Sequence, residues 1–357
     1  MRAPSAASLP ARHAFLTLLP ILLAVLSLGS ACGSAPRAPA SERFHRGVCW
    51  VAGRAVGAED LEPLERIHVS WISQTPFGWQ AEAGDTDIET ATSGHVLWGE
   101  SDEGLLETTR LAHERGIKVL LKPHLWLRRS WPGEIAMRGE EDWRAWFASY
   151  RGFILHYADL AERSGVEALA VGTELGGTTR REAEWRALIA DVRARYRGKL
   201  TYCANWSEDV EHVAFWDALD WIGVQAYYPL TEKPAPTVDQ LLEGWRKPVA
   251  TLKALSARTK RPVLFTEVGY HALDTAASRP WEWRLEGRPS EETQARCYEA
   301  LCRVAEANPW IQGIYIWKWF PRHDRDRGRR RGDYTPQGKS AERVLEREYR
   351  KIAASGR

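Results

Sequence analysis

From Phe44 onward the sequence alternates short apolar runs with amphipathic stretches in which apolar residues recur every three or four positions. The short runs are typical of buried strands in a parallel sheet, and the amphipathic stretches are typical of helices that cover such a sheet. The eight runs span residues 47–51, 67–72, 117–123, 168–171, 199–204, 219–225, 262–267 and 311–317. Eight strand–helix units predict an α/β fold, a single (β/α)8 TIM barrel.

Helix-end signals fit this pattern. An apolar stripe from Trp143 to Ala161 predicts a long helix that ends at Gly165, and Ser290 is the expected N-cap of a later helix. The same alternation could also build an open doubly wound sheet. No glycine-rich phosphate loop opens any expected helix, however, so the nucleotide-binding form of that fold lacks its main support.

The N-terminus has the pattern of an export signal. Arg2 and Arg12 precede an apolar run at 14–28, which is followed by small residues and Cys32. We therefore expect a lipoprotein-type signal peptide at 1–31, a lipidated Cys32, a flexible tether at 32–43 and the barrel at 44–357. Because Gly29 stands where such sites usually have leucine, a plainly cleaved signal or an uncleaved anchor stays open. The expected location is the bacterial cell envelope.

Charge and cysteine content exclude several classes of protein. Without residues 1–31 the chain carries 47 basic and 47 acidic residues, which gives no indication of a nucleic-acid-binding surface. Cys49, Cys203, Cys297 and Cys302 lack the spacing of a disulfide framework or a zinc site, so we expect buried free thiols. We expect a monomer with no metal and no cofactor, attached to the membrane only through its lipid.

Two glutamates follow expected strands in the same local pattern. Glu174 and Glu267 each come as Thr-Glu after an apolar run, on the fourth and seventh strands. A single glutamate there often caps a helix or forms a rim salt bridge, but a pair is typical of a retaining glycosidase, with carboxyls about 5–5.5 Å apart. We assign Glu174 as general acid/base and Glu267 as nucleophile. Tyr227 is the expected hydrogen-bond partner of Glu267, and Tyr228 is the alternative.

Aromatic and polar residues that follow the other strands predict a sugar site. The chain has 18 Trp but only 8 Phe, and indole faces stack on sugar rings. Trp79 is expected in the loop after the second strand. His124 could instead be a buried, hydrogen-bonded residue, and some of the indoles could be core. The expected substrate-binding residues include Trp79, His124, Trp126, Asn205, Trp206, Tyr228 and Trp317. The arginine-rich run 322–331 is expected as a solvated loop, with an anionic saccharide as the alternative partner.

Several motifs resemble those of one glycosidase family. They are Val171–Leu175, Trp221–Tyr228, Phe265–Tyr270, Trp317–Trp319 and Asp333–Lys339. From about 44 to 350 the chain resembles glycoside hydrolase family 113, within the retaining clan that has its acid/base on strand four and its nucleophile on strand seven. The resemblance implies an endo-β-1,4-mannanase. Thr173 stands where the clan usually has an asparagine that contacts the sugar, which makes Thr173 a further expected substrate-binding residue.

Three functional hypotheses therefore remain. The favoured one is a retaining, endo-acting glycosidase for a β-1,4-linked mannan-like polysaccharide or its oligosaccharides. The second is a carbohydrate-binding lipoprotein on the same barrel without turnover, and the third is a retaining enzyme for a different β-glycan. Both glutamates speak against the second hypothesis, because a binding protein does not need a carboxyl pair.

Overall fold

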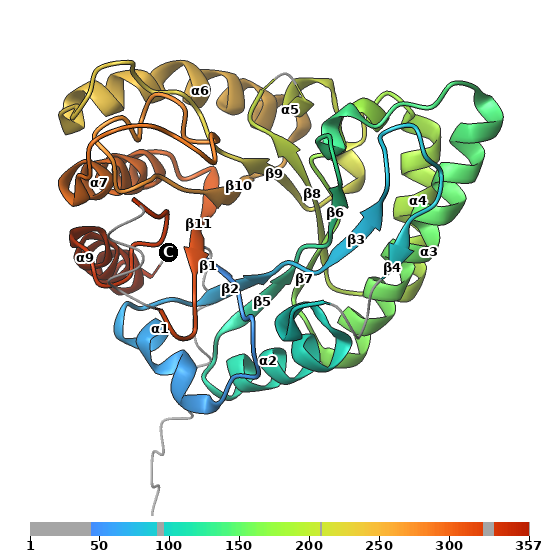
Figure 1. Ribbon diagram of the computed structural model, residues 1–357, viewed down its shortest axis with the longest axis horizontal. Helices are drawn as coiled ribbons and strands as arrows, with labels where there is room; N and C mark the ends of the chain where they lie inside the picture. Colours follow the sequence, from blue (N-terminus) through green and yellow to red (C-terminus); the bar gives the residue numbers. More distant parts are fainter. Residues whose placement is uncertain (1–43, 91–95, 208, 324–331, 357) are drawn as a thin grey trace, which may run out of the picture. The chain divides into compact units, whose positions relative to one another are not determined.

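The structure is a computed structural model that describes residues 44–90, 96–207, 209–323 and 332–356 (Figure 1). The predicted signal peptide, Cys32 and the tether lie outside the described residues, as does most of the arginine-rich run, so the predictions made for them stay predictions. Ser41–Arg357 form one compact unit. Within the described ranges, no helix combines the length and the apolar character needed to cross a membrane.

Eight parallel strands close into a barrel, as predicted. Their order around it is β1-β11-β10-β9-β8-β7-β5-β2. The strands are β1 (His45–Trp50), β2 (Trp71–Gln74), β5 (Lys118–Leu121), β7 (Ala168–Thr173), β8 (Lys199–Asn205), β9 (Trp221–Gln225), β10 (Val263–Val268) and β11 (Ile311–Trp319). β2 begins four residues later than predicted. His68 has a left-handed φ of 59°, which turns the chain before the strand can start.

Helices surround the barrel on the outside (Figure 1). The long ones are α2 (Asp102–Glu114), α3 (Glu140–Ser164), α4 (Glu182–Arg195), α6 (Val238–Thr259), α7 (Glu291–Ala307) and α9 (Ser340–Ala354). The short helices are η1 (Ala58–Leu61), α1 (Glu62–Arg66), η2 (Trp98–Glu100), η3 (Pro132–Glu134), η4 (Gly176–Thr178), α5 (Asp209–His212) and η5 (Trp216–Ala218). Both predicted helix ends are confirmed. Gly165 ends α3 with a φ of 72°, and the Ser290 hydroxyl accepts a hydrogen bond from the Thr293 amide.

Large side chains fill the barrel interior near the strand starts. His45 stacks on Trp71 with 3.8 Å between the ring centroids and hydrogen-bonds the Tyr315 hydroxyl at 2.8 Å. The interior cluster of the barrel consists of Cys49, Trp71, Leu120, Ala168, Trp221, Leu264 and Tyr315. Because this cluster fills the barrel interior, a ligand site is expected at the opposite end, where the strands finish.

A second, three-stranded sheet has the order β4-β3-β6 and corrects one prediction. β3 (Phe77–Gln80) follows β2 directly, β6 (His124–Leu127) follows β5, and β4 (Glu89–Thr90) completes the accessory sheet. The sequence predicted a loop around Trp79. The segment is a strand because its inward residues pack on α3, a tertiary contact that a four-residue pattern does not reveal. Gly78, for example, lies so close to Phe153 that there is no space for a Cβ.

Candidate active site

The ends of the barrel strands surround a cavity of about 480 Å³. Its lining residues are Trp131, Glu174, Asn205, Trp206, Ser207, Tyr227, Glu267, Trp281, Trp283, Trp317 and Tyr334. Both glutamates assigned from the sequence are in this set. The cavity therefore contains one carboxyl pair and seven aromatic side chains.

Glu174 lies one residue beyond the end of β7. Its φ of 54° is left-handed, which turns the chain sharply out of the strand, and its amide donates to the Cys203 carbonyl of β8 at 2.8 Å. The carboxyl accepts hydrogen bonds from Asn205 Nδ2 at 2.8 Å and from Trp131 Nε1 at 3.3 Å. Burial, with a contribution from the Glu267 charge, raises the pKa of Glu174 to about 7. Glu174 can therefore hold a proton at near-neutral pH.

Glu267 lies on β10 and is almost completely buried. Tyr227 Oη donates to its Oε1 at 2.6 Å, and Gln225 Nε2 donates to its Oε2 at 3.0 Å. The Lys122 ammonium forms an ion pair with Oε2. Burial acts to raise the pKa of Glu267, but the charge of Lys122 and the donated hydrogen bonds outweigh burial and lower it below the usual value. Glu267 is therefore held as a carboxylate.

Lys122 follows β5 and its side chain is fully buried. Burial alone would lower its pKa, but the Glu267 carboxylate outweighs this effect and the pKa is raised above the ordinary value. Its Nζ also lies 3.5 Å from Gln225 Oε1, which in turn accepts from the Thr266 hydroxyl at 3.1 Å. A buried cation that keeps its charge stabilises the anionic form of its partner.

The walls of the cavity come mainly from loops that follow β8, β10 and β11. Trp206 and Trp281 lie with their ring centroids 4.9 Å apart, although they come from different loops. Tyr334, which follows β11, is fixed against the loop after β10, because its hydroxyl donates to the Pro280 carbonyl at 2.6 Å and its ring centroid lies 3.7 Å from that of His271. Aromatic faces of this kind stack on the apolar faces of sugar rings.

The structure brings together only some of the predicted site residues. Asn205, Trp206, Tyr227 and Trp317 line the cavity together with both glutamates. Of the two tyrosines considered for Glu267, Tyr227 makes the hydrogen bond. Tyr228 instead packs against Trp245 with 5.5 Å between the ring centroids, and it lines a neighbouring hollow beside α6.

The other predicted substrate-binding residues lie elsewhere. The buried hydroxyl of Thr173 donates to the Pro123 carbonyl at 3.0 Å, which directs it away from the cavity. The ring of His124 packs at a tilt against Phe77, with 5.3 Å between the ring centroids. Burial and the Lys122 charge lower the pKa of His124 to about 3, so this ring is neutral. Trp79 and Trp126 line a separate hollow on the accessory sheet.

Sequence reasoning missed several cavity residues. Trp281 and Trp283 lie in the long loop after the seventh strand, whose length was itself a signal of function, but no single residue was assigned there. Lys122 had a weaker signal, since it is a lysine directly after the apolar residues 119–121 of the third strand. Trp131 had none, because its approach to Glu174 depends on the path of the chain after β6 of the accessory sheet.

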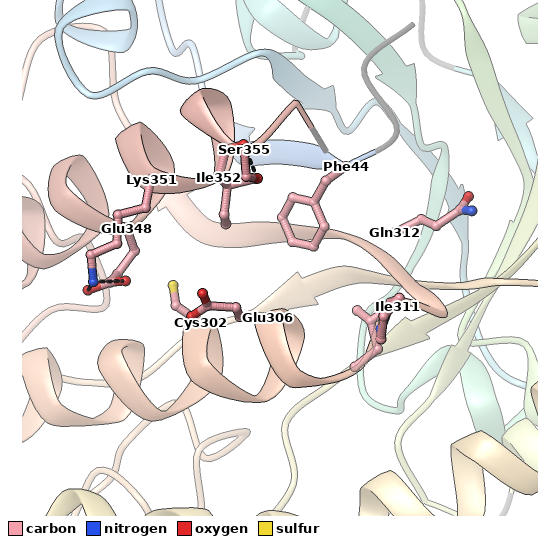
Figure 2. A pocket seen from close by; sticks show the side chains of 10 residues that line it. Phe44, Cys302, Glu306, Ile311, Gln312, Glu348, Lys351, Ile352 and Ser355 are labelled. Atoms are coloured by element: carbon pink, nitrogen blue, oxygen red, sulfur yellow. Dashed lines mark hydrogen bonds and ion pairs between the residues drawn. The ribbon is translucent and has the colours of Figure 1, made fainter. Parts of the chain in front are cut away.

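A second hollow of about 470 Å³ lies at the opposite end of the barrel (Figure 2). Phe44 and Ile311 line it where β1 and β11 begin, together with residues near the ends of α7 and α9. Of the two carboxylates that line it, Glu306 and Glu348, the latter is already bound to Lys351 at 3.0 Å. Because catalytic residues of barrels lie at the strand ends, this hollow is not the active-site candidate. Within the described ranges, no group of three or more His, Cys, Asp or Glu could hold a metal ion.

Comparisons with known proteins agree with the geometry. The profile of Glycoside Hydrolase Family 113 matches residues 50–339. A GH113 β-mannanase from Alicyclobacillus acidocaldarius is 32% identical with a TM-score of 0.75, covering 88% of this chain and 100% of that one. A second GH113 β-1,4-mannanase is 29% identical with a TM-score of 0.74, covering 86% and 99%.

More distant structures show the fold alone. A β-glucuronidase from Ruminococcus gnavus is 15% identical with a TM-score of 0.60, covering 86% of this chain and 50% of that one. No curated protein matches the chain. The profile match spans most of the sequence and includes both glutamates of the cavity, so the chain is a glycosidase acting on a polysaccharide or oligosaccharide, and it belongs to glycoside hydrolase family 113.

Proposed function

We propose that the protein is a retaining endo-β-1,4-mannanase in which Glu267 is the nucleophile and Glu174 the general acid/base. One observation carries this proposal. Two carboxyls line one cavity, and their surroundings shift the two pKa values in opposite directions. A retaining glycosidase needs this pairing of one ionised and one protonated carboxyl.

In the first step, a Glu267 carboxylate oxygen attacks the anomeric carbon while the bond from that carbon to the leaving oxygen breaks. Glu174 donates its proton to the leaving oxygen, so the departing sugar leaves as a neutral alcohol. Tyr227 and Lys122 hold the nucleophile in position through their contacts with its two carboxylate oxygens. The products of this step are a glycosyl ester on Glu267 and an ionised Glu174.

In the second step, Glu174 takes a proton from a water molecule whose oxygen attacks the same anomeric carbon. The ester bond to Glu267 breaks, and both residues return to their starting protonation states. Two inversions at one carbon give net retention. Asn205, which donates to Glu174 at 2.8 Å, orients the carboxyl in both steps.

Mannan is the favoured substrate because two similar structures are those of GH113 mannanases. The chemistry of the cavity is compatible with this choice, since its walls offer indole and phenol faces for a pyranose and the Asn205 amide and Ser207 hydroxyl for its hydroxyl groups. Thr173, which departs from the clan pattern, keeps its hydroxyl on Pro123, so Asn205 is the better candidate for contact with the sugar.

The test is hydrolysis of a panel of β-glycans by purified residues 42–357. We expect reducing sugar from mannan, β-anomers as first products by NMR, and loss of activity in Glu267→Ala. Glu243→Ala, on the outer surface of α6, is a matched control that should keep full activity. Binding of manno-oligosaccharides without release of reducing sugar would leave the non-enzymatic alternative, and hydrolysis of another glycan alone would replace mannan as the substrate.

We also propose that Cys32 is lipidated and that the enzyme is attached to the bacterial cell envelope. The support is the basic, apolar and small-residue order of residues 1–31. Expression with an alkyne-labelled fatty acid should label the wild type and not Cys32→Ser. A Cys32→Ser protein that is still retained on the membrane would contradict the lipid anchor.

A further inference from the structure

We propose that the outer face of the accessory sheet is a second saccharide-binding surface, which holds a neutral β-linked polysaccharide outside the catalytic cavity. Its centre is formed by the exposed side chains of Trp79 and Trp126, which we call the indole platform. The inference rests on the proposed function for the class of polymer, but its geometry is independent of the two glutamates. The platform and the catalytic cavity have no lining residue in common.

The platform is built from residues in register across three strands. Trp79 of β3 pairs with Trp126 of β6 on one side and with Glu89 of β4 on the other. The two indoles are 42% and 50% exposed, and their ring centroids lie 6.2 Å apart. Paired residues in neighbouring strands point to the same face of a sheet, so the platform presents two indoles and one carboxylate in a row.

These indoles do not hold the sheet in place, because its opposite face does so. The inward Gln80 accepts a hydrogen bond from Trp146 Nε1 at 3.0 Å, and it donates to the Glu82 and Asp85 carbonyls at 2.9 and 3.0 Å. Leu125 and Leu127 are buried on the same inward face. Two large exposed aromatic side chains on an already packed sheet indicate a binding surface.

The hollow over the platform has a volume of about 620 Å³ and a polar rim. Its lining residues are Trp79, Gln80, Ala81, Asp85, Thr86, Asp87, Glu89, Trp126 and Arg128. Three carboxylates and one guanidinium give the rim a net negative charge, which disfavours an anionic polysaccharide. Indoles beside hydroxyl-binding carboxylates fit a neutral, hydroxyl-rich chain.

The platform lies close to the catalytic cavity along the chain. One row nearer the barrel, Phe77 pairs with His124, and the Phe77 ring lies 6.0 Å from that of Trp126. His124 is two residues after Lys122, the partner of Glu267, and Trp131 of the cavity wall is four residues after β6. We therefore expect a polymer bound on the platform to extend toward the catalytic cavity, and a short oligosaccharide to depend on the cavity alone, because the two linings share no residue.

The experiment compares a polymer with a short substrate. Trp79→Ala, Trp126→Ala and the double variant are assayed on soluble mannan and on an aryl β-mannobioside, with Leu106→Ala on α2 as the control for loss of an exposed apolar side chain. We expect KM for the polymer to rise about two- to tenfold for each indole removed, with kcat unchanged. The aryl substrate should be cut as by wild type, and all variants should unfold at the wild-type temperature.

Affinity electrophoresis of Glu267→Ala in gels containing soluble β-glycans tests binding without turnover. The platform is supported if Glu267→Ala is retarded and the retardation disappears when Trp79→Ala and Trp126→Ala are added to it. This holds even if wild type cleaves no glycan in the panel, a result that would count only against the proposed function. The platform is overturned if polymer and aryl substrate lose activity equally. It is also overturned if the double variant keeps the wild-type KM for the polymer, or if no glycan in the panel retards Glu267→Ala.

Discussion

Lys122 and Glu267 form a buried ion pair, although they come from strands that are not neighbours in the barrel. Leu121 ends β5 just before Lys122, and Glu267 lies near the end of β10. The pair places a cation against the carboxylate that we propose as the nucleophile. Most of the expected chemistry of this enzyme depends on that contact.

Replacing Lys122 tests this dependence. In Lys122→Met the ion pair is lost and burial then raises the pKa of Glu267, so less of the nucleophile is ionised. We expect kcat/KM at pH 5 to fall by about 100-fold, with the acid limb of the pH profile moved to higher pH. Lys118→Met is the control on the same strand, because Lys118 lies over the Trp71 ring at the far end of the barrel. An unshifted acid limb in folded Lys122→Met would contradict this role.

The pH profile of wild type should be bell-shaped. Activity rises as Glu267 loses its proton, at a pKa below the usual 4.5, and it falls as Glu174 loses its proton at about 7. The optimum is therefore expected on the acid side of neutrality. Measuring kcat/KM from pH 3 to 9 checks both limbs. A basic limb that persists in Glu174→Gln, assayed on an aryl glycoside with a good leaving group, would assign it to another residue.

Glu174 should also make stability depend on pH. Its folded pKa of about 7 lies above the unfolded value of 4.5, so the folded state binds the extra proton between these values and the free energy of unfolding decreases as pH rises through them. Glu174→Gln removes the ionisable carboxyl and with it this decrease in the free energy of unfolding. We expect the variant to be about 2–3 kcal/mol more stable than wild type at pH 8 and nearly equal to it at pH 4. Urea unfolding at the two pH values measures the difference, and an equal effect at both would refute the linkage.

The two neighbouring tyrosines should behave differently. Tyr227→Phe loses a 2.6 Å hydrogen bond to the Glu267 carboxylate, and hydrogen bonds to charged groups contribute about 1.5–3 kcal/mol. We expect kcat to fall about 10- to 100-fold. Tyr228→Phe keeps its ring against Trp245 and should retain kcat within about threefold. Steady-state kinetics of both variants measure the two losses. A larger fall in kcat for Tyr228→Phe than for Tyr227→Phe would favour Tyr228 as the residue that supports the nucleophile.

Residues adjacent in sequence show where sequence reasoning reaches its limit. Successive residues along an extended chain point to opposite faces, so a shift of one position moves a side chain from the cavity to the outside of the barrel. Tyr227 and Tyr228 are both plausible from their pattern, and only the direction of the chain after β9 separates them. Trp79 and Trp126 were predicted as substrate-binding residues of the barrel site, but the structure places them outside the cavity, in a separate hollow. Their location on a separate sheet follows from the packing of β3 and β6 on α3, which no local pattern encodes.

The sequence by itself determined the barrel and the two glutamates. Eight apolar runs specify eight buried parallel strands, and all strand ends of a closed barrel meet at one rim, so Thr-Glu after two of the runs suffices to bring Glu174 and Glu267 to the same end. Tertiary structure alone decided which groups set the pKa values and orientations of these two carboxyls. Lys122, Gln225 and Trp131 reach the glutamates from other strands and loops, and their contacts depend on strand order and loop paths rather than on their own sequence neighbourhoods.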